Sequence, residues 1–216
     1  MPWTFYNASG EAMIQDGGLT IANNTNNYVV TGTGVAGAAL NGESALTFDG
    51  TTLTIAGQIA FPASQSANAG ANVLDDYEEG VWTPGISDSS LDPEGDDKSQ
   101  GYDLQVGHYT KIGRLVTISG NITMNSVGSM TAGNTANIVG LPFTSKNVTS
   151  YSASVHFGNG SGLAIGDNHS IAGVILLNRV YIDVKEWDAT TGVASAMTVA
   201  ELSADGHLEF SASYIT

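Results

Sequence analysis

Residues 116–124 read Val-Thr-Ile-Ser-Gly-Asn-Ile-Thr-Met, and this alternation of inward and polar positions decides the fold class. Alternate side chains of a β-strand point to opposite faces of a sheet, so the stretch predicts a strand with one buried face. Three further inward rows follow toward the C-terminus: Tyr151, Ala153, Val155 and Phe157; Val180, Ile182 and Val184; and Leu208, Phe210, Ala212 and Tyr214.

Turn-rich loops separate these rows, and no sustained helical period interrupts them. Several strands at this spacing predict an all-β fold, a jelly-roll-like antiparallel β-sandwich. The one helical candidate is a single turn over 72–78, with Asn72 as its N-cap.

Residues 1–61 have a different pattern, in which short apolar stretches alternate with small polar residues. Residues 46–55 read Leu-Thr-Phe-Asp-Gly-Thr-Thr-Leu-Thr-Ile, which predicts a hairpin with Asp-Gly in its turn. Residues 62–72 contain no large apolar side chain. We therefore expect an extended N-terminal arm with short hairpins over 1–61, a linker over 62–72 and the sandwich over 73–216.

Composition excludes several function classes. The 216 residues carry 21 acidic and 6 basic side chains, a net charge of −15, which argues against nucleic acid and anionic membranes as partners. The absence of cysteine excludes disulfides, a Cys-ligated metal and a thiol nucleophile. No apolar run approaches the length of a membrane helix and the first residues lack a signal-peptide pattern, so no membrane insertion is expected.

The acidic residues are concentrated between 75 and 97, and no Lys or Arg precedes Lys98. This acidic cluster is a candidate contact for a cation or a basic partner, and Lys111 and Arg114 are candidate counter-charges, within one subunit or across a subunit contact. The cluster consists of Asp75, Asp76, Glu78, Glu79, Asp88, Asp92, Asp96 and Asp97.

The loop over 88–97 has the carboxylates that calcium prefers, but its glycine does not fit an EF-hand loop. A solvated acidic loop is the favoured interpretation, so neither a metal site nor a cofactor is predicted, and calcium is the alternative.

Catalytic patterns are missing from the sequence. It has no Gly-x-Ser-x-Gly elbow, and its four histidines make no His-x-His or His-Glu-x-x-His spacing. The carboxylates cannot be assigned to glycoside hydrolysis from their spacing. We therefore expect no enzymatic activity. Trp187 falls on the face opposite Ile182 and Val184, which makes it a candidate contact for a glycan or another subunit.

Three blocks of sequence carry a resemblance to a known group. Residues 74–84 read Leu-Asp-Asp-Tyr-Glu-Glu-Gly-Val-Trp-Thr-Pro, residues 106–113 read Val-Gly-His-Tyr-Thr-Lys-Ile-Gly, and residues 140–144 read Gly-Leu-Pro-Phe-Thr. Their order and spacing resemble a domain of the small fibre-like and decoration-like structural proteins of tailed bacteriophages. The opening stretch 2–10 and the hairpin over 46–57 are similar to N-terminal pieces of the same group.

The resemblance implies a β-rich homotrimer on the virion surface, assembled in the host cytoplasm. The favoured expectation is a capsid decoration or cement protein that docks on the major capsid protein through the aromatic side chains of its arm, Trp3, Phe5 and Tyr6. Short strands in the arm suit a strap that adds strands to neighbouring chains. The alternative is a short tail-fibre or receptor-binding protein that recognises a host surface glycan.

Overall fold

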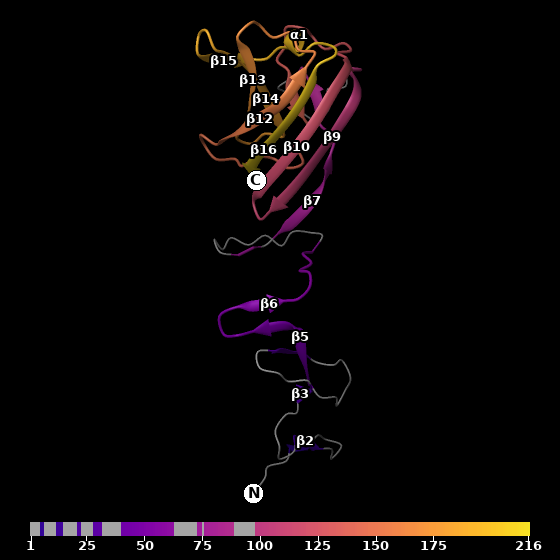
Figure 1. Ribbon diagram of the computed structural model, residues 1–216, viewed down its shortest axis with the longest axis vertical. Helices are drawn as coiled ribbons and strands as arrows, with labels where there is room; N and C mark the ends of the chain where they lie inside the picture. The colour runs from indigo at the N-terminus through magenta and orange to yellow at the C-terminus, as the bar shows by residue number, and fades with distance from the viewer. Residues whose placement is uncertain are drawn as a thin grey trace. The chain divides into compact units, whose positions relative to one another are not determined.

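The computed structural model is almost entirely β-structure, which confirms the all-β prediction (Figure 1). It divides into two compact units, Met1–Ala60 and Phe61–Thr216. The residues that the structure describes are 5–6, 12–14, 21–22, 28–31, 40–62, 73–74, 76–88 and 98–216. Nearly all of the predicted linker therefore lies outside the described residues.

The N-terminal unit contains two small sheets. In the first, β1 (Phe5–Tyr6) pairs with β2 (Ala12–Ile14). In the second, β5 (Leu40–Phe48) lies between β3 (Ile21–Ala22) and β4 (Tyr28–Thr31), and its C-terminal part also pairs with β6 (Leu53–Ile55).

The predicted hairpin is confirmed as β5 and β6, in which Phe48 lies opposite Leu53. Asp49 closes the turn because its carboxylate accepts the backbone N–H groups of Thr51 at 2.9 Å and Thr52 at 2.6 Å. Gly50 has a φ of 97°, a conformation that favours glycine.

This unit has no interior of its own among the side chains that are described. Over 43–60 every side chain is partly or fully exposed, and Phe48, Leu53 and Ile59 are 50%, 55% and 63% exposed. Small sheets without a buried apolar face are marginally stable in water. The described side chains of this unit therefore supply no buried core to stabilise its sheets.

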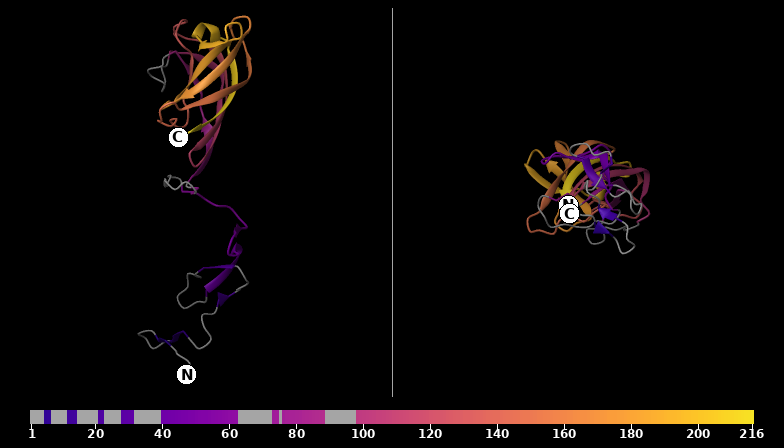
Figure 2. Two further views of the ribbon diagram at one scale, coloured as in Figure 1. Left: turned by 90° about the vertical axis from the view of Figure 1, so that its left-hand side faces the viewer. Right: turned by 90° about the horizontal axis from the view of Figure 1, so that it is seen from below.

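The C-terminal unit is one antiparallel sheet of ten strands, curled around a core (Figures 1 and 2). The strand order is β7-β9-β10-β16-β12-β13-β14-β11-β8, and β15 pairs with β14. The two layers of the predicted sandwich thus belong to one continuous sheet. The strands are β7 (Tyr77–Trp82), β8 (Gly85–Ser87), β9 (Gly101–Ile112), β10 (Leu115–Ser126), β11 (Asn137–Val139), β12 (Ser152–Ser161), β13 (His169–Leu176), β14 (Tyr181–Asp188), β15 (Val193–Ala196) and β16 (His207–Ile215).

The core confirms most of the inward rows that alternation predicts, whereas Tyr151, Ala153 and Phe157 are half-buried and Val180 lies half-buried just before β14. The row that begins at Val116 on β10 and the row that begins at Leu208 on β16 are buried. These two strands pair along nine residues. Burying a large aliphatic side chain stabilises the fold by about 1.5–3 kcal/mol, so these rows account for much of the unit's stability. The buried members are Val116, Ile118, Ile122, Met124, Val155, Ile182, Val184, Leu208, Phe210, Ala212 and Tyr214.

The predicted helical turn over 72–78 is wrong, because β7 begins at Tyr77 and pairs with β9. The short helix is instead α1 (Val199–Leu202). Its capping box pairs Thr198 with Glu201: the Thr198 hydroxyl accepts the Glu201 N–H at 3.3 Å, and the Glu201 carboxylate accepts the Thr198 N–H at 2.6 Å. In the part of the chain that is described, no helix is long and apolar enough to span a membrane.

Candidate functional site

The three sequence blocks come together where β7 pairs with β9. Antiparallel pairing places Glu78 opposite Lys111 and Trp82 opposite Gly107, so the first two blocks run side by side. Phe143, from the third block, packs against Tyr109 and Lys111 of β9. Blocks that are separate in the sequence therefore form one cluster in the fold.

A buried ion pair between Lys111 and Asp76 anchors the start of β7. The backbone carbonyl of Asp76 also accepts the Gly113 N–H at 2.9 Å, so both the side chain and the main chain of this residue are held. Lys111 Nζ lies 5.5 Å from the centre of the Phe143 ring, within the range of a cation–π interaction. These contacts fix the point at which the chain enters the C-terminal sheet.

Tyr109 joins the same cluster through its hydroxyl and its ring. The hydroxyl donates a hydrogen bond to the Glu78 carboxylate, which raises the pKa of Tyr109 to about 12. The ring meets Phe143 edge-on, with ring centres 5.3 Å apart and an interplanar angle of 85°. Phe143 is held in turn by Tyr214, whose hydroxyl donates to the Phe143 carbonyl at 2.9 Å. Since the phenol of Tyr109 stays protonated at neutral pH, it remains a hydrogen-bond donor.

Two glycines in the blocks make room for these aromatic rings. A Cβ atom on Gly80 would lie 2.7 Å from the Tyr109 hydroxyl, and one on Gly107 would overlap the indole of Trp82. The Trp82 indole N–H donates to the Ser119 carbonyl at 3.2 Å. Packing therefore explains why glycine and aromatic residues stand at these positions of the blocks.

The described members of the predicted acidic cluster each have a partner within the chain. Asp76 and Glu78 have the contacts given above, and Glu79 accepts a hydrogen bond from the Tyr77 hydroxyl at 2.9 Å. In the described part of the chain, no three His, Asp or Glu side chains are placed to hold a metal ion. The members that lie outside the described residues are Asp75, Asp92, Asp96 and Asp97.

Asp88, where the candidate calcium loop begins, is buried and helps to position a neighbouring turn. Its carboxylate accepts the Thr131 backbone N–H at 2.7 Å and the Asn134 side-chain amide at 3.2 Å. The rest of that loop, 89–97, lies outside the described residues. The calcium interpretation stays a prediction.

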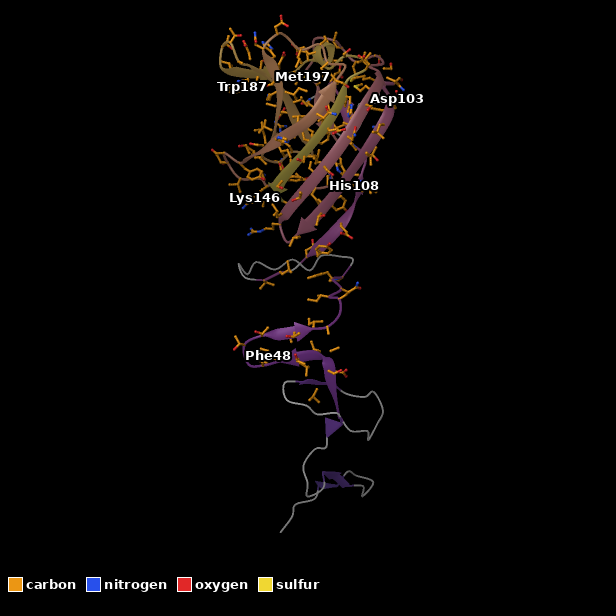
Figure 3. The ribbon with its side chains drawn as sticks, in the orientation of Figure 1. Phe48, Asp103, His108, Lys146, Trp187 and Met197 are labelled. Carbon is orange, nitrogen blue, oxygen red and sulfur yellow. The ribbon has the colours of Figure 1, made fainter. Side chains whose placement is uncertain are left out.

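The remaining candidate residues lie apart from the cluster. Arg114 is exposed in the turn between β9 and β10, and its guanidinium makes no ion pair with any described residue. Trp187 is 44% exposed on β14, directly opposite Ser170 and Ala194 (Figure 3). Of the aromatic side chains predicted to dock the arm, Phe5 and Tyr6 form β1, and Trp3 lies outside the described residues.

Sequence reasoning missed a histidine that lies between acidic side chains at the opposite end of the unit. His169 Nδ1 makes a close contact with the buried carboxylate of Glu186, and its Nε2 lies 3.5 Å from Asp188. The hydrogen bond to Glu186 raises the pKa of His169. Burial alone would raise the pKa of Glu186, but hydrogen bonds from His169 and the Gly166 N–H outweigh it and lower that pKa.

One signal in the sequence points to this contact. Glu186 continues the inward row of Ile182 and Val184, and a carboxylate on a core-facing position needs a partner. The identity of that partner depends on the pairing of β13 with β14, which the sequence does not reveal.

Comparison with known proteins gives one structural likeness. No protein-family model matches the chain, and no curated protein matches it. The fold is similar to the crystal structure of the Dettilon tailspike protein, with 17% sequence identity and a TM-score of 0.50. The match covers 64% of this chain and 24% of the tailspike, and at this identity it speaks to the fold alone.

Proposed function

We propose that this chain is a non-enzymatic structural protein of a tailed-bacteriophage virion, and that it belongs to the tail as a short fibre or spike component. The observation that carries the proposal is the likeness of its fold to a tailspike protein. The three sequence blocks support the same conclusion from a separate direction, since they resemble phage virion-surface proteins. That resemblance also implies a homotrimer.

In the fold of this chain the three blocks pack together. Asp76, Tyr109 and Phe143 come from different blocks, and all three take part in the cluster between β7 and β9. A shared packing unit accounts for the order and spacing of the blocks without any catalytic role. The blocks are thus a structural signature of the domain.

The N-terminal unit is the proposed attachment region. Its β5–β6 hairpin leaves Phe48 and Leu53 half exposed, and its described side chains bury nothing among themselves. Covering such apolar side chains on another virion protein would stabilise both the unit and the attachment. In the tail placement this partner is a tail protein, and in the capsid placement it is the major capsid protein.

Copy number separates the tail placement from the alternative of capsid decoration. A decoration protein covers the capsid in hundreds of copies, whereas a tail fibre or spike is present in a few dozen or fewer. Quantitative mass spectrometry of purified virions, scaled to the major capsid protein, measures this ratio. A low copy number is the expected result, and hundreds of copies would assign the chain to the capsid instead.

A tail placement gives the C-terminal unit the further proposed role of recognising a host surface glycan. Trp187 is the candidate contact, because an exposed indole offers a flat apolar face beside the polar side chains of Ser170 and Lys185. Comparing the adsorption of wild-type and Trp187→Ala virions to host cells tests this role.

A further inference from the structure

The outward side of the layer β7-β9-β10-β16 is a broad surface of the C-terminal unit that carries few charged side chains. Its positions are the odd residues of 77–81, the even residues of 104–112 and the odd residues of 115–123 and 207–215. They alternate with buried positions such as Val116 and Leu208, so their side chains point away from the core. We call this surface the outer face.

Four large apolar side chains cross the outer face as a continuous row. Tyr77 lies opposite Ile112, Ile112 opposite Leu115, and Leu115 opposite Ile215, so the row spans four neighbouring strands. They are 45%, 48%, 48% and 37% exposed. Single exposed apolar residues need no explanation, but a contiguous row of four is typical of an interaction site.

Two shallow hollows lie on either side of His108, which Figure 3 labels on β9. A hollow of about 390 Å³ lies toward β7, and its lining includes Glu79 and Val81. One of about 360 Å³ lies toward β10, and its lining includes Val106, Ser119 and Glu209. Side chains of a partner could fill both hollows, which would give the outer face shape complementarity with that partner.

The outer face carries little charge in a chain whose net charge is −15. Glu79 and Glu209 are its two formally charged side chains. Glu79 accepts a hydrogen bond from Tyr77, and Glu209 accepts one from the Asn121 amide at 3.4 Å. The surface thus combines apolar side chains with Ser, Thr and His, and its acids already have partners.

The small number of charges on the outer face indicates which class of partner suits it. A basic partner would be attracted to the acidic residues elsewhere on the chain, and an anionic partner would find no Lys or Arg on this face. A second copy of the chain carries the same −15, so electrostatic repulsion between copies is smallest where the surfaces in contact carry few acids, and this face carries two. Few charged side chains together with exposed apolar ones are also what subunit interfaces have in common.

We propose that copies of this chain associate through the outer face of β7-β9-β10-β16, with the row from Tyr77 to Ile215 at the contact. This surface would hold the subunits of the proposed homotrimer together. Only the number of copies, three, rests on the proposed function, and the location of the chain in a virion is not needed.

The absence of cysteine allows a direct test on the full-length protein. Ser119→Cys places one thiol at the centre of the outer face, and Ser195→Cys places one on β15, outside it; both serines are exposed in the single chain. We expect Ser119→Cys to react with a maleimide at least tenfold more slowly than Ser195→Cys. Equal rates would overturn the proposal, and denaturant should make the two rates equal.

A second test removes the apolar row without touching the core. The double variant Ile112→Ser/Leu115→Ser should restore fast labelling of Ser119→Cys by at least tenfold, whereas Leu177→Ser/Val193→Ser, at two exposed apolar residues outside the face, should leave labelling slow. Sedimentation of the wild-type protein should give a multiple of 22.2 kDa. A monomeric wild type, or slow labelling that survives the double variant, would contradict the proposal. Neither result depends on whether virions contain the chain.

Discussion

At the scale of single residues, the Lys111–Asp76 pair is the contact whose loss should cost the most. Both side chains are buried, so removing one leaves the other as an unpaired charge in the interior. Buried pairs of this kind stabilise a fold little relative to an apolar pair, but breaking one is expensive. The pair therefore specifies where β7 starts more than it raises total stability.

Replacing Lys111 by Met should lower the free energy of unfolding by about 3–5 kcal/mol, because Asp76 would stay buried without a partner. The double variant Lys111→Met/Asp76→Leu should recover most of this loss. Arg114→Met is the matched control, since that cation is exposed, and should change stability by less than about 0.5 kcal/mol. Urea denaturation measures all three, and a Lys111→Met variant as stable as wild type would refute the role of the pair.

His169 should make stability depend on pH. The carboxylates of Glu186, Asp188 and Glu201 face it, and its pKa is raised above the ordinary 6.5, mainly by the hydrogen bond to Glu186. A group whose pKa is higher in the folded state stabilises the fold fully below its ordinary pKa and loses this contribution as the pH rises through the folded-state pKa.

The melting temperature of the wild type should therefore exceed that of His169→Asn at about pH 5.5, and the difference should shrink by about pH 8.5. His156→Asn is the control, because His156 is exposed on β12. It removes an imidazole that does not pair with a buried carboxylate of any described residue. A difference between wild type and His169→Asn that grows with pH would contradict the account.

At the scale of elements, close packing of β7 on β9 depends on glycine. A methyl group on Gly107 would overlap the Trp82 indole, so Gly107→Ala should destabilise the unit by about 1–3 kcal/mol. Gly158→Ala is the control, because a Cβ there meets no atom within 4 Å. Denaturation midpoints compare the two variants, and equal effects would show that the indole can move aside without cost.

The elements that the sequence predicted are those with a local signal. The alternation in 116–124 and 208–214 and the Asp-Gly turn at 49–50 predicted strands and a hairpin correctly, because period and turn chemistry are properties of neighbouring residues. The helix α1 was missed although Thr198 and Glu201 form a recognisable capping box. The helical turn expected over 72–78 was wrong because pairing with β9 overrides local preference.

The candidate site was less predictable than the strands. The sequence makes Lys111 a candidate counter-charge for the acids but leaves open whether its partner lies in the same subunit, and the structure identifies Asp76 of the same chain. Contacts such as Tyr109 with Phe143 join positions far apart in the chain, so they follow from strand order. Strand order has no local signal in the sequence, so contacts that depend on it cannot be predicted from neighbouring residues.

At the scale of the whole molecule, the two units differ in how far their described side chains are buried. The C-terminal unit has a buried core, whereas the described side chains of the N-terminal unit have none. Residues 61–216 should therefore unfold cooperatively on their own. Calorimetry of that fragment would contradict this if it showed no cooperative transition.

The N-terminal hairpin should decide attachment. Phe48→Ser/Leu53→Ser removes two half-exposed apolar side chains and should reduce the copies per virion at least tenfold without altering the C-terminal unit. Thr54→Ser, an exposed polar position of the same hairpin, is the control and should leave incorporation unchanged. Full incorporation of the double variant would place the attachment elsewhere.

The central claim is that the chain is a tail component of a phage virion. Immunogold electron microscopy of intact particles, with antibodies raised against residues 98–216, tests it most directly. We expect gold on the tail and little on the capsid. Gold spread over the capsid would contradict the tail placement, and particles that contain no detectable chain would contradict the virion assignment itself.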